Sequence, residues 1–246
     1  MHVTKVRRQF DGPDDAALLA LFGAIASGDH RGAMRRIDEA PGLATWPIRI
    51  AATRQDPQTY FLPLIHHYVY AGDTALHLAA AAHHRELSKF VVAQGADVRA
   101  RNRRGAEPLH YAADGSPIAD DWDRDAQREV IIYLIENGAN PNAMDKSGVA
   151  ALHRAVRNRC SDAVAALIGN GADPRLMNKS GSTPLHLAVQ NTGKSNSGSG
   201  AAKDEQRRII ALLLEHGASS GDVDANGKTV AAAASSDWIR AQLDNI

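Results

Sequence analysis

The sequence predicts an all-α solenoid in which helix–turn–helix units stack side by side. Two recurring dipeptides, with apolar residues at helical spacing between them, indicate this fold. The first dipeptide is Leu-His, and its histidines are 33, 43 and 33 residues apart: Leu76-His77, Leu109-His110, Leu152-His153 and Leu185-His186. The second is Gly-Ala, which follows each Leu-His pair: Gly95-Ala96, Gly138-Ala139, Gly171-Ala172 and Gly217-Ala218. The chain therefore carries four similar units, and the second and fourth contain insertions.

Residues 1–40 precede the regular units and contain a degenerate form of the same two-helix pattern, LLALFGAIASGDHRGAMRRI (18–37). A single unit cannot bury its apolar face alone, so units must stack, and the outermost ones must present a polar outer side. We therefore expect residues 1–40 to form N-terminal capping helices of a single domain that spans residues 1–246.

Residues 41–72 leave the pattern. Five of the twelve aromatic residues of the chain fall here, together with several prolines: Trp46, Tyr60, Phe61, Tyr68 and Tyr70. This aromatic-rich insertion is too apolar to be a disordered linker. We expect an elaborated loop or a long β-hairpin that folds against one face of the stack, where it either covers the N-terminal core or extends a binding surface.

Residues 73–224 hold the four full repeats, and the first of them shows the construction. After His77 a run of small residues (78–82) predicts one helix, and Leu87, Phe90 and Val91 at helical spacing predict a second. Gly95 then follows, as a left-handed cap at a helix C-terminus requires. Each unit is therefore expected to be one helix–turn–helix.

Two insertions, residues 114–129 and 191–206, separate the first and second helices of the second and fourth full repeats. The first is acidic around Trp122, and the second is rich in glycine and serine, which predicts a mobile loop. Both should emerge on the same side of the stack and lie near each other. One is a candidate contact loop, and the other a tolerated flexible loop.

Residues 225–246 close the array. They include GKTVAAAASSDWIRAQL (227–243), another degenerate unit, in which Asp237 and Arg240 provide polar outer positions. We expect a C-terminal capping unit here, for the same reason that the N-terminal end needs one.

The repeats resemble a known family. The segment TALHLAAAAHHRELSKFVVAQGADVRARN (74–102) is similar to a whole ankyrin repeat, and GSTPLHLAVQ (181–190) is similar to the signature of that family. The resemblance implies β-hairpin loops between repeats and a structural role for the four repeat histidines. Ala75, Ala150 and Ala151 replace the usual Thr-Pro, which should loosen local capping without changing the fold.

Catalytic, metal and nucleotide sites are each incomplete in this sequence. The pairs His66-His67 and His83-His84 lack ligand spacing on a helix, and no Cys-x-x-Cys or His-Glu-x-x-His string accompanies them. Gly193-Lys194-Ser195 and Gly227-Lys228-Thr229 lack the earlier glycine of a phosphate-binding loop. The histidine near Cys160 already belongs to the repeat framework. We therefore expect no metal, no cofactor and no enzymatic activity.

Charge and cysteine content limit the partners and the compartment that we expect for this protein. Lysine and arginine total 28, as do aspartate and glutamate, so no overall field draws the protein to nucleic acid or anionic lipid. A single cysteine suits a reducing compartment, and no apolar run approaches the roughly 18 residues of a membrane span. We expect a small, stand-alone, monomeric cytoplasmic protein, and its size and simple organisation indicate a bacterial source.

The resemblance to ankyrin proteins implies binding through hairpin tips and the inner face of the first helices. The residues at those positions are mostly basic with apolar interruptions: Tyr70, Arg101, Arg103, Arg104, Met144, Lys146, Arg157, Met177 and Lys179. Arginine, methionine and tyrosine are enriched at interfaces. The sequence thus predicts a non-enzymatic protein–protein interaction module, an adaptor, inhibitor or scaffold, for a protein partner with an acidic surface.

Two alternatives remain for these residues. The charges can form an ordinary solvated face with no partner. The same row of Arg and Lys can also associate with nucleic acid, although the neutral overall charge and the lack of aromatic residues among the tips disfavour it.

Overall fold

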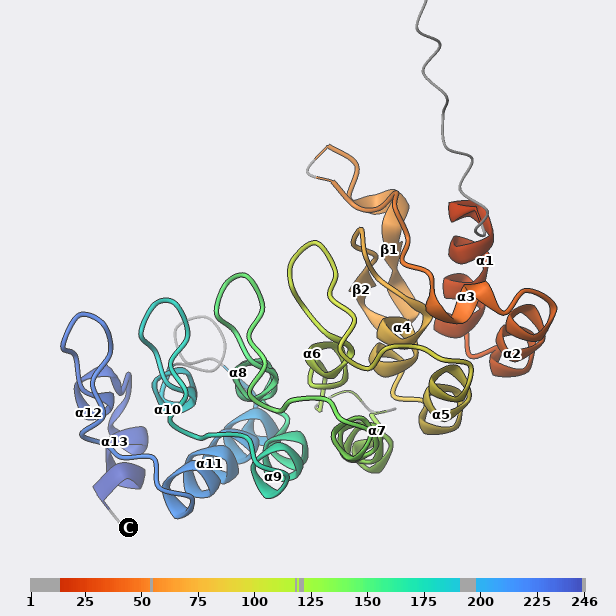
Figure 1. Ribbon diagram of the computed structural model, residues 1–246. Helices are drawn as coiled ribbons and strands as arrows, with labels where there is room; N and C mark the ends of the chain where they lie inside the picture. Colours follow the sequence, from red (N-terminus) through yellow and green to blue (C-terminus); the bar gives the residue numbers. More distant parts are fainter. Residues whose placement is uncertain (1–13, 54, 118, 120–121, 191–197, 245–246) are drawn as a thin grey trace, which may run out of the picture.

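The computed structural model describes residues 14–53, 55–117, 119, 122–190 and 198–244. Two rows of helices run along the molecule, and a row of loops projects from one side (Figure 1). The first helices of the four units are α4 (Ala75–Ala81), α6 (Pro108–Ala112), α8 (Ala151–Arg157) and α10 (Pro184–Ala188). The second helices are α5 (Arg85–Ala93), α7 (Arg124–Glu136), α9 (Ser161–Gly169) and α11 (Gly200–Glu215). The predicted all-α solenoid is confirmed.

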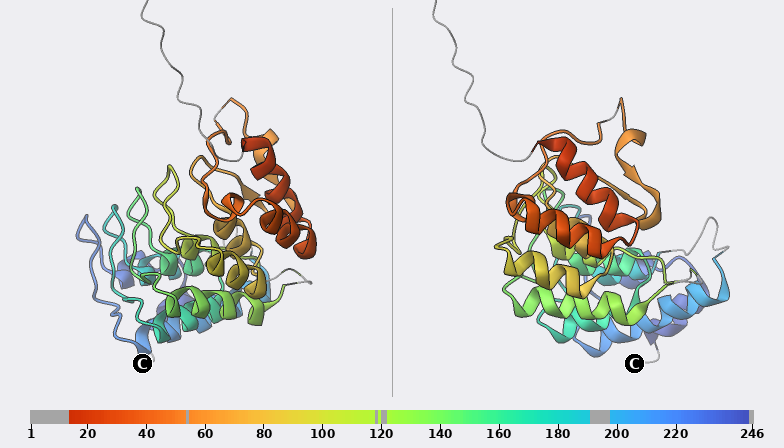
Figure 2. Two further views of the ribbon diagram at one scale, coloured as in Figure 1. Left: turned by 45° about the vertical axis from the view of Figure 1, so that its right-hand side comes forward. Right: turned by 90° about the vertical axis from the view of Figure 1, so that its right-hand side faces the viewer.

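One hydrophobic core runs through the whole stack, from Leu18 at one end to Leu243 at the other. Helices α1 (Asp15–Ala26) and α2 (His30–Glu39) lie beyond the first unit, and α12 (Val230–Ala233) and α13 (Asp237–Asp244) lie beyond the last (Figure 2). The terminal helix α13 buries Ile239 and Leu243 and leaves the side chain of Asp237 fully exposed. Each end therefore turns one apolar face inward and a polar face to water, as a stack requires.

The repeat histidines tie each unit to the next. In all four units the Nδ1 atom accepts a hydrogen bond from the backbone N–H at the start of the first helix, at 3.1–3.3 Å. A ring nitrogen that accepts from an N–H leaves the other nitrogen as the donor. The Nε2 atoms of His77, His110 and His186 accordingly donate to backbone carbonyls of the following unit, at 3.0–3.2 Å.

The start of α8 shows why the missing Thr-Pro is tolerated. Ala150 has no side-chain oxygen to cap the helix, whereas Thr183 at the equivalent position of α10 accepts from the backbone N–H of His186. The other half of the capping pair persists, because the Ala150 N–H still donates to His153 Nδ1 at 3.2 Å. Local capping is weakened and the helix remains.

The aromatic-rich insertion is folded and attached to the stack. It contains α3 (Gly42–Thr45), two single 3₁₀ turns (Gln58–Tyr60 and Pro63–Ile65) and the antiparallel strands β1 (Phe61–Leu62) and β2 (His67–Tyr68). Backbone hydrogen bonds connect Ile48 with Asp73 at 2.9 Å and Ala52 with Val69 at 3.0 Å. The strands pair over only two residues each, so the elaborated loop is the correct alternative and the long β-hairpin is wrong. The prolines and the turns on both sides of each strand limit its length.

The two insertions are partly helical. Helix α7 begins at Arg124 and α11 at Gly200, so the second half of each insertion lengthens a second helix. Ser199 caps α11 by accepting from the Ala202 N–H at 3.2 Å, and Gln206 is fully buried. The expectation of a mobile glycine-serine loop is therefore wrong for residues 200–206, because burial of one face stabilises the added helical turns. Residues 191–197 lie outside the described residues.

The insertions lie side by side, as expected. Arg124 in the first insertion donates to Glu205 in the second at 2.8 Å. The Trp122 ring packs against His83 at 5.0 Å between ring centroids, which pins the first insertion to the stack. The contact between the insertions is made by their helical parts.

Candidate functional site

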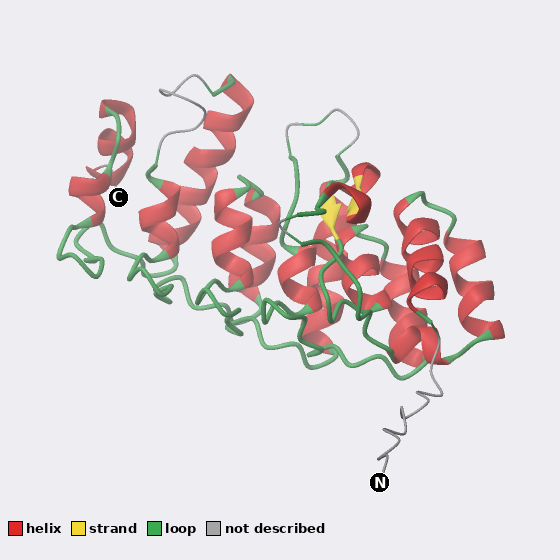
Figure 3. Ribbon diagram, turned by 90° about the horizontal axis from the view of Figure 1, so that it is seen from above, coloured by secondary structure: helices red, strands yellow, loops and turns green. Residues whose placement is uncertain are grey.

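A groove of about 470 Å³ lies between the aromatic-rich insertion and the inner side of the stack. Seen from above, the two strands stand over the helices and are set back from the row of projecting loops (Figure 3). The hairpin supplies one wall, the helices α6 and α8 supply the floor, and the loops supply the other wall. The lining residues are His66, His67, Tyr68, Tyr70, Asn102, Arg104, Ala106, Tyr111, Asp114, Asp145, Ser147, Val149, Arg154, Arg157, Asn158, Asn178 and Ser180.

A buried ion-pair cluster forms the floor. Arg154 of α8 donates to Asp114 Oδ2 at 2.9 Å and to Asp145 Oδ2 at 3.3 Å. Asn158, one helical turn later, donates to Asp114 Oδ1 at 3.0 Å. The Arg154 side chain is only 15% exposed. The cluster therefore holds α8, the segment that follows α6 and the loop that precedes α8 in one fixed arrangement.

The two carboxylates respond differently to this environment. Burial raises the pKa of Asp114 above its ordinary value, although Arg154 and Asn158 oppose that effect. Burial acts in the same direction on Asp145, but its hydrogen bonds from the backbone N–H groups of Val149 and Ser147, together with Arg154, outweigh it, and the pKa of Asp145 is lowered. Among the described residues, Arg154 is the one cation that pairs with both carboxylates.

A second buried network forms the back of the groove. The Tyr111 hydroxyl donates to Asp73 at 2.8 Å, and Asn102 donates to the same carboxylate at 2.8 Å. The backbone N–H of Tyr70 also donates to Asp73, at 2.7 Å. Burial, reinforced by the negative charge of Asp73, raises the pKa of Tyr111 well above its ordinary value, so it remains a donor. The network fastens the end of the aromatic-rich insertion to the second unit.

His67 covers this network from the hairpin. Its ring meets the Tyr111 ring edge-on, with 4.1 Å between centroids. Burial lowers the pKa of His67 to about 4, so the ring is neutral at pH 7. Its Nε2 atom is buried and has no hydrogen-bond partner among the described residues.

Substituting phenylalanine for Tyr111 tests the structural importance of the network. We expect Tyr111→Phe to lower the free energy of unfolding by about 1–3 kcal/mol, because Asp73 loses a buried donor and remains desolvated. Urea denaturation at pH 7 measures the change. Tyr133→Phe is the control, since Tyr133 on α7 is half-buried and its hydroxyl donates to no side chain among the described residues. An equal loss in both variants would contradict the assignment.

Two arginines in the groove have no carboxylate partner among the described residues. Arg104 donates to the Tyr70 hydroxyl at 2.9 Å, and its guanidinium lies 4.8 Å from the Tyr70 ring centroid. Arg157 is exposed, and within the described part of the chain it makes neither a hydrogen bond nor an ion pair. Stacking on Tyr70 holds the Arg104 charge at the groove wall.

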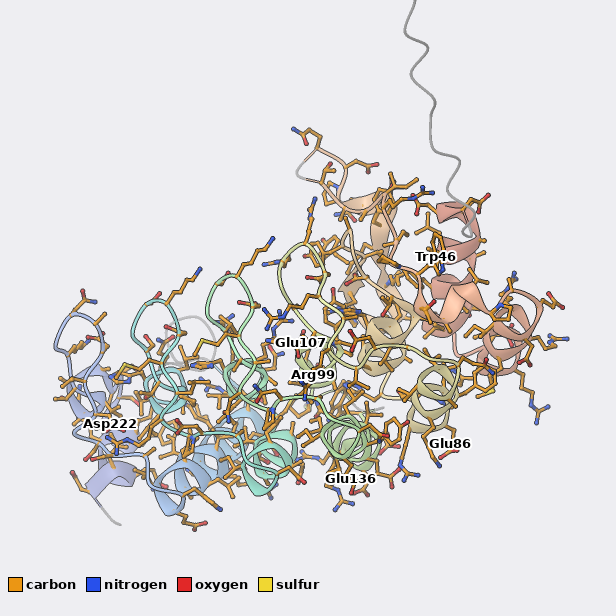
Figure 4. All side chains as sticks on the ribbon, in the orientation of Figure 1. Trp46, Glu86, Arg99, Glu107, Glu136 and Asp222 are labelled. Atoms are coloured by element: carbon orange, nitrogen blue, oxygen red, sulfur yellow. The ribbon has the colours of Figure 1, made fainter. Side chains whose placement is uncertain are left out.

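The structure brings together three of the nine predicted partner-binding residues: Tyr70, Arg104 and Arg157 all line the groove. Arg101 instead pairs with the buried carboxylate of Glu107 at 2.9 Å, near the start of α6 (Figure 4). Arg103 donates to the Ala52 carbonyl at 2.6 Å, which is a contact with the insertion. Both side chains thus have partners within the fold.

The four remaining predicted residues lie on the loops outside the groove lining. Lys146 and Lys179 are exposed on successive loops, and the Lys179 ammonium donates to the Lys146 carbonyl. Met177 is 47% exposed, whereas Met144 is half-buried. These residues border the groove side of the molecule without forming its walls.

Sequence reasoning missed Arg154 and the histidines of the hairpin. Arg154 could have been found, because it precedes Arg157 by three residues and therefore shares its helical face. No local pattern places His66 and His67 over the second unit, because their position depends on how the insertion folds back.

Burial raises the pKa of the Cys160 thiol to about 12, so it remains protonated at pH 7 and supplies no thiolate. Across residues 14–53, 55–117, 119, 122–190 and 198–244, no three histidine, cysteine or acidic side chains converge as metal ligands would. In the same residues no helix has the length and apolar character that crossing a membrane demands.

Comparisons with known proteins agree with the repeat pattern. The family model "Ankyrin repeats (3 copies)" matches residues 49–120 and 123–197, and the model "Ankyrin repeat" matches residues 180–228. A Fowlpox virus (strain NVSL) protein described as an ankyrin repeat protein is 29% identical over 112 residues, covering 35% of this chain and 77% of the viral protein. The E3 ubiquitin-protein ligase KEG of Arabidopsis thaliana is 35% identical over 94 residues, which cover 37% of this chain and 5% of the plant protein.

Proposed function

Because this chain belongs to the ankyrin-repeat family, whose repeats are generally protein–protein interaction modules, we propose that it binds a partner protein in the groove. The family is typically non-enzymatic, and stacked repeats offer extended concave surfaces for binding. The role is that of an adaptor, inhibitor or scaffold. The partner presents an acidic surface.

The observation that carries the proposal is that two arginines in the groove have no carboxylate partner among the described residues. Arg154 offsets much of the charge of Asp114 and Asp145 on the floor, whereas Arg104 and Arg157 have no carboxylate partner among the described residues. Arginine beside tyrosine is a composition typical of residues that dominate binding energy. An acidic partner would supply the missing carboxylates.

The groove is also arranged in advance of binding. Its floor is held by the Arg154 ion pairs and its back by the Asp73 network. Arg104 is already held against Tyr70. A partner would therefore order few side chains on binding, which lowers the entropic cost of association.

The test reverses both charges. We expect the double variant Arg104→Glu, Arg157→Glu to lose at least 10-fold in capture of its partner from a lysate of the source cells, because like charges oppose an acidic surface. The matched control is Arg35→Glu, Arg36→Glu, which makes the same charge change on the exposed side of α2. Quantitative mass spectrometry of the captured proteins measures the effect, and far-ultraviolet circular dichroism checks the fold.

Two outcomes oppose the proposal. An unchanged set of captured proteins for the groove variant shows that the groove is not the binding site. An equal loss in both double variants shows a response to net charge and not to the groove.

Nucleic-acid association is the alternative, and the geometry favours it less. Arg101 is already paired with Glu107, and Arg103 with the Ala52 carbonyl, so part of the basic row that a phosphate backbone would need has partners within the fold. Fluorescence anisotropy with a labelled single-stranded RNA at low salt distinguishes a nucleic-acid partner from a protein partner. Saturable, salt-sensitive RNA binding that the groove variant loses would replace the protein partner with a nucleic acid.

A further inference from the structure

Residues 63–66 connect β1 to β2 and form the crown of the hairpin. The crown presents an exposed apolar side chain at the edge of the groove. Leu64 is 72% exposed, more than any other large hydrophobic residue among those described. Its neighbour Ile65 packs against the core, so Leu64 alone points away from it. His66, two residues later, already lines the groove, and therefore the crown and the groove are continuous.

Aromatic packing supports this crown. The Phe61 ring lies 4.7 Å from the Tyr68 ring and 6.4 Å from the His66 ring, between centroids. His66 adopts a left-handed conformation with φ of 47°, which turns the chain sharply after the 3₁₀ turn. The exposed leucine therefore stands on a packed support, and an apolar group on such a support is a suitable anchor for a partner.

The groove spans successive repeats. Its loop wall contains Arg104, Ser147 and Ser180, each from a different loop, and neighbouring helices pack roughly 8–10 Å apart. Three loops therefore extend over roughly 20 Å, which an extended chain of about six residues covers. Arg104 and Arg157 belong to adjacent units, so a segment that crosses from one unit to the next needs carboxylates a few residues apart to meet both.

From these features we infer that the groove and the hairpin crown form one two-part site for a short, extended acidic segment of a partner protein. Carboxylates of the segment pair with Arg104 and Arg157, and an apolar side chain at its end packs on Leu64. This inference rests on the proposed function and adds the chemistry of the bound segment. Its apolar part distinguishes it from simple attraction to an acidic surface.

The experiment measures binding of labelled synthetic peptides by fluorescence polarisation with the full chain. One series has a terminal leucine and two glutamates spaced two, three or four residues apart in a glycine-serine background. A second series replaces the leucine with glycine, and a third replaces the glutamates with glutamine. We expect the leucine-glutamate series to bind, the glycine series to bind about 10-fold more weakly, and the glutamine series not to bind.

The variant Leu64→Ser separates the two parts of the site. It should weaken binding of the leucine peptides about 10-fold and leave the glycine peptides unchanged, because only the former bury an apolar group there. Val223→Ser is the matched control, since Val223 is also exposed, at 46%, in a loop that does not line the groove. Both variants alter exposed side chains and should fold normally.

Failures of the two proposals can be told apart. Equal binding of the leucine and glycine peptides, or no effect of Leu64→Ser, overturns the two-part site and leaves the acidic-partner groove standing. Absence of peptide binding up to millimolar concentration also overturns the two-part site. The capture from a lysate tests the proposed function of the groove independently of the peptides. Binding of the glutamine series as tightly as the glutamate series contradicts the role of both arginines.

Discussion

Substituting methionine for Arg154 is expected to lower the free energy of unfolding by about 3–5 kcal/mol. The arginine is the shared partner of Asp114 and Asp145, and its side chain is largely buried. Methionine keeps much of the volume of the side chain but removes the charge and every donor. Two carboxylates are then left desolvated without a cation, and breaking one side of a buried ion pair is far more costly than losing a surface pair.

Urea denaturation at pH 7 measures this loss for Arg154→Met. The control is Arg128→Met on α7, because the side chains of Arg128 and Asp125 are 49% and 80% exposed and such a pair contributes about 1 kcal/mol at most. The triple variant that adds Asp114→Asn and Asp145→Asn to Arg154→Met should recover part of the stability. If Arg154→Met is no less stable than Arg128→Met, the cluster does not hold the groove floor.

Mild acid is expected to destabilise the protein, with an effect as large as that of the Arg154 substitution. Burial lowers the pKa of His67, His83 and His110 to about 4, compared with 6.5 in an unfolded chain. Between pH 6.5 and 4 the unfolded chain binds protons that the folded chain does not. Stability therefore falls as the pH decreases through this window, by roughly 2 kcal/mol per histidine at pH 5.

Buried carboxylates act in the opposite direction and reduce the net effect. Burial raises the pKa of Glu107 and of Asp114, so their protonation in acid favours the folded state. Urea denaturation at pH 7 and pH 5 measures the net change in the free energy of unfolding from the histidines and the carboxyl groups together. Three histidines lose stability in acid whereas two carboxyl groups gain it, so we expect a net loss.

The variant His83→Asn assigns the effect to a residue. Asparagine tolerates the left-handed conformation that His83 adopts, with φ of 50°, and does not titrate. The loss of stability from pH 7 to pH 5 should be smaller by roughly 2 kcal/mol in this variant, whatever its stability at pH 7. His216→Asn changes an exposed histidine and is the control. Identical pH dependence in all three proteins would show that buried His83 is not a source of the acid sensitivity.

Short-range patterns in the sequence determined the repeat helices and their order, whereas the resemblance to the ankyrin family implied the structural role of the repeat histidines. The Leu-His and Gly-Ala landmarks mark the start of one helix and the end of the next, and both depend on backbone hydrogen bonds within a few residues. The proximity of the two insertions followed from the same regularity, and the Arg124–Glu205 contact confirms it. The resemblance to ankyrin proteins, applied to the repeat positions, predicts Tyr70, Arg104 and Arg157 as binding residues, and this stays a prediction.

Only the tertiary structure determined where the groove lies and which of its charged residues are paired. The pairing of Arg154 with Asp114 joins residues 40 positions apart, and that of Asp73 with Tyr111 joins residues 38 apart. The hairpin wall depends on an insertion that follows no repeat, and the helical half of residues 191–206 depends on burial against α9. Local sequence specifies local hydrogen bonding, whereas burial and ion pairing depend on which distant side chains share the same low-dielectric space.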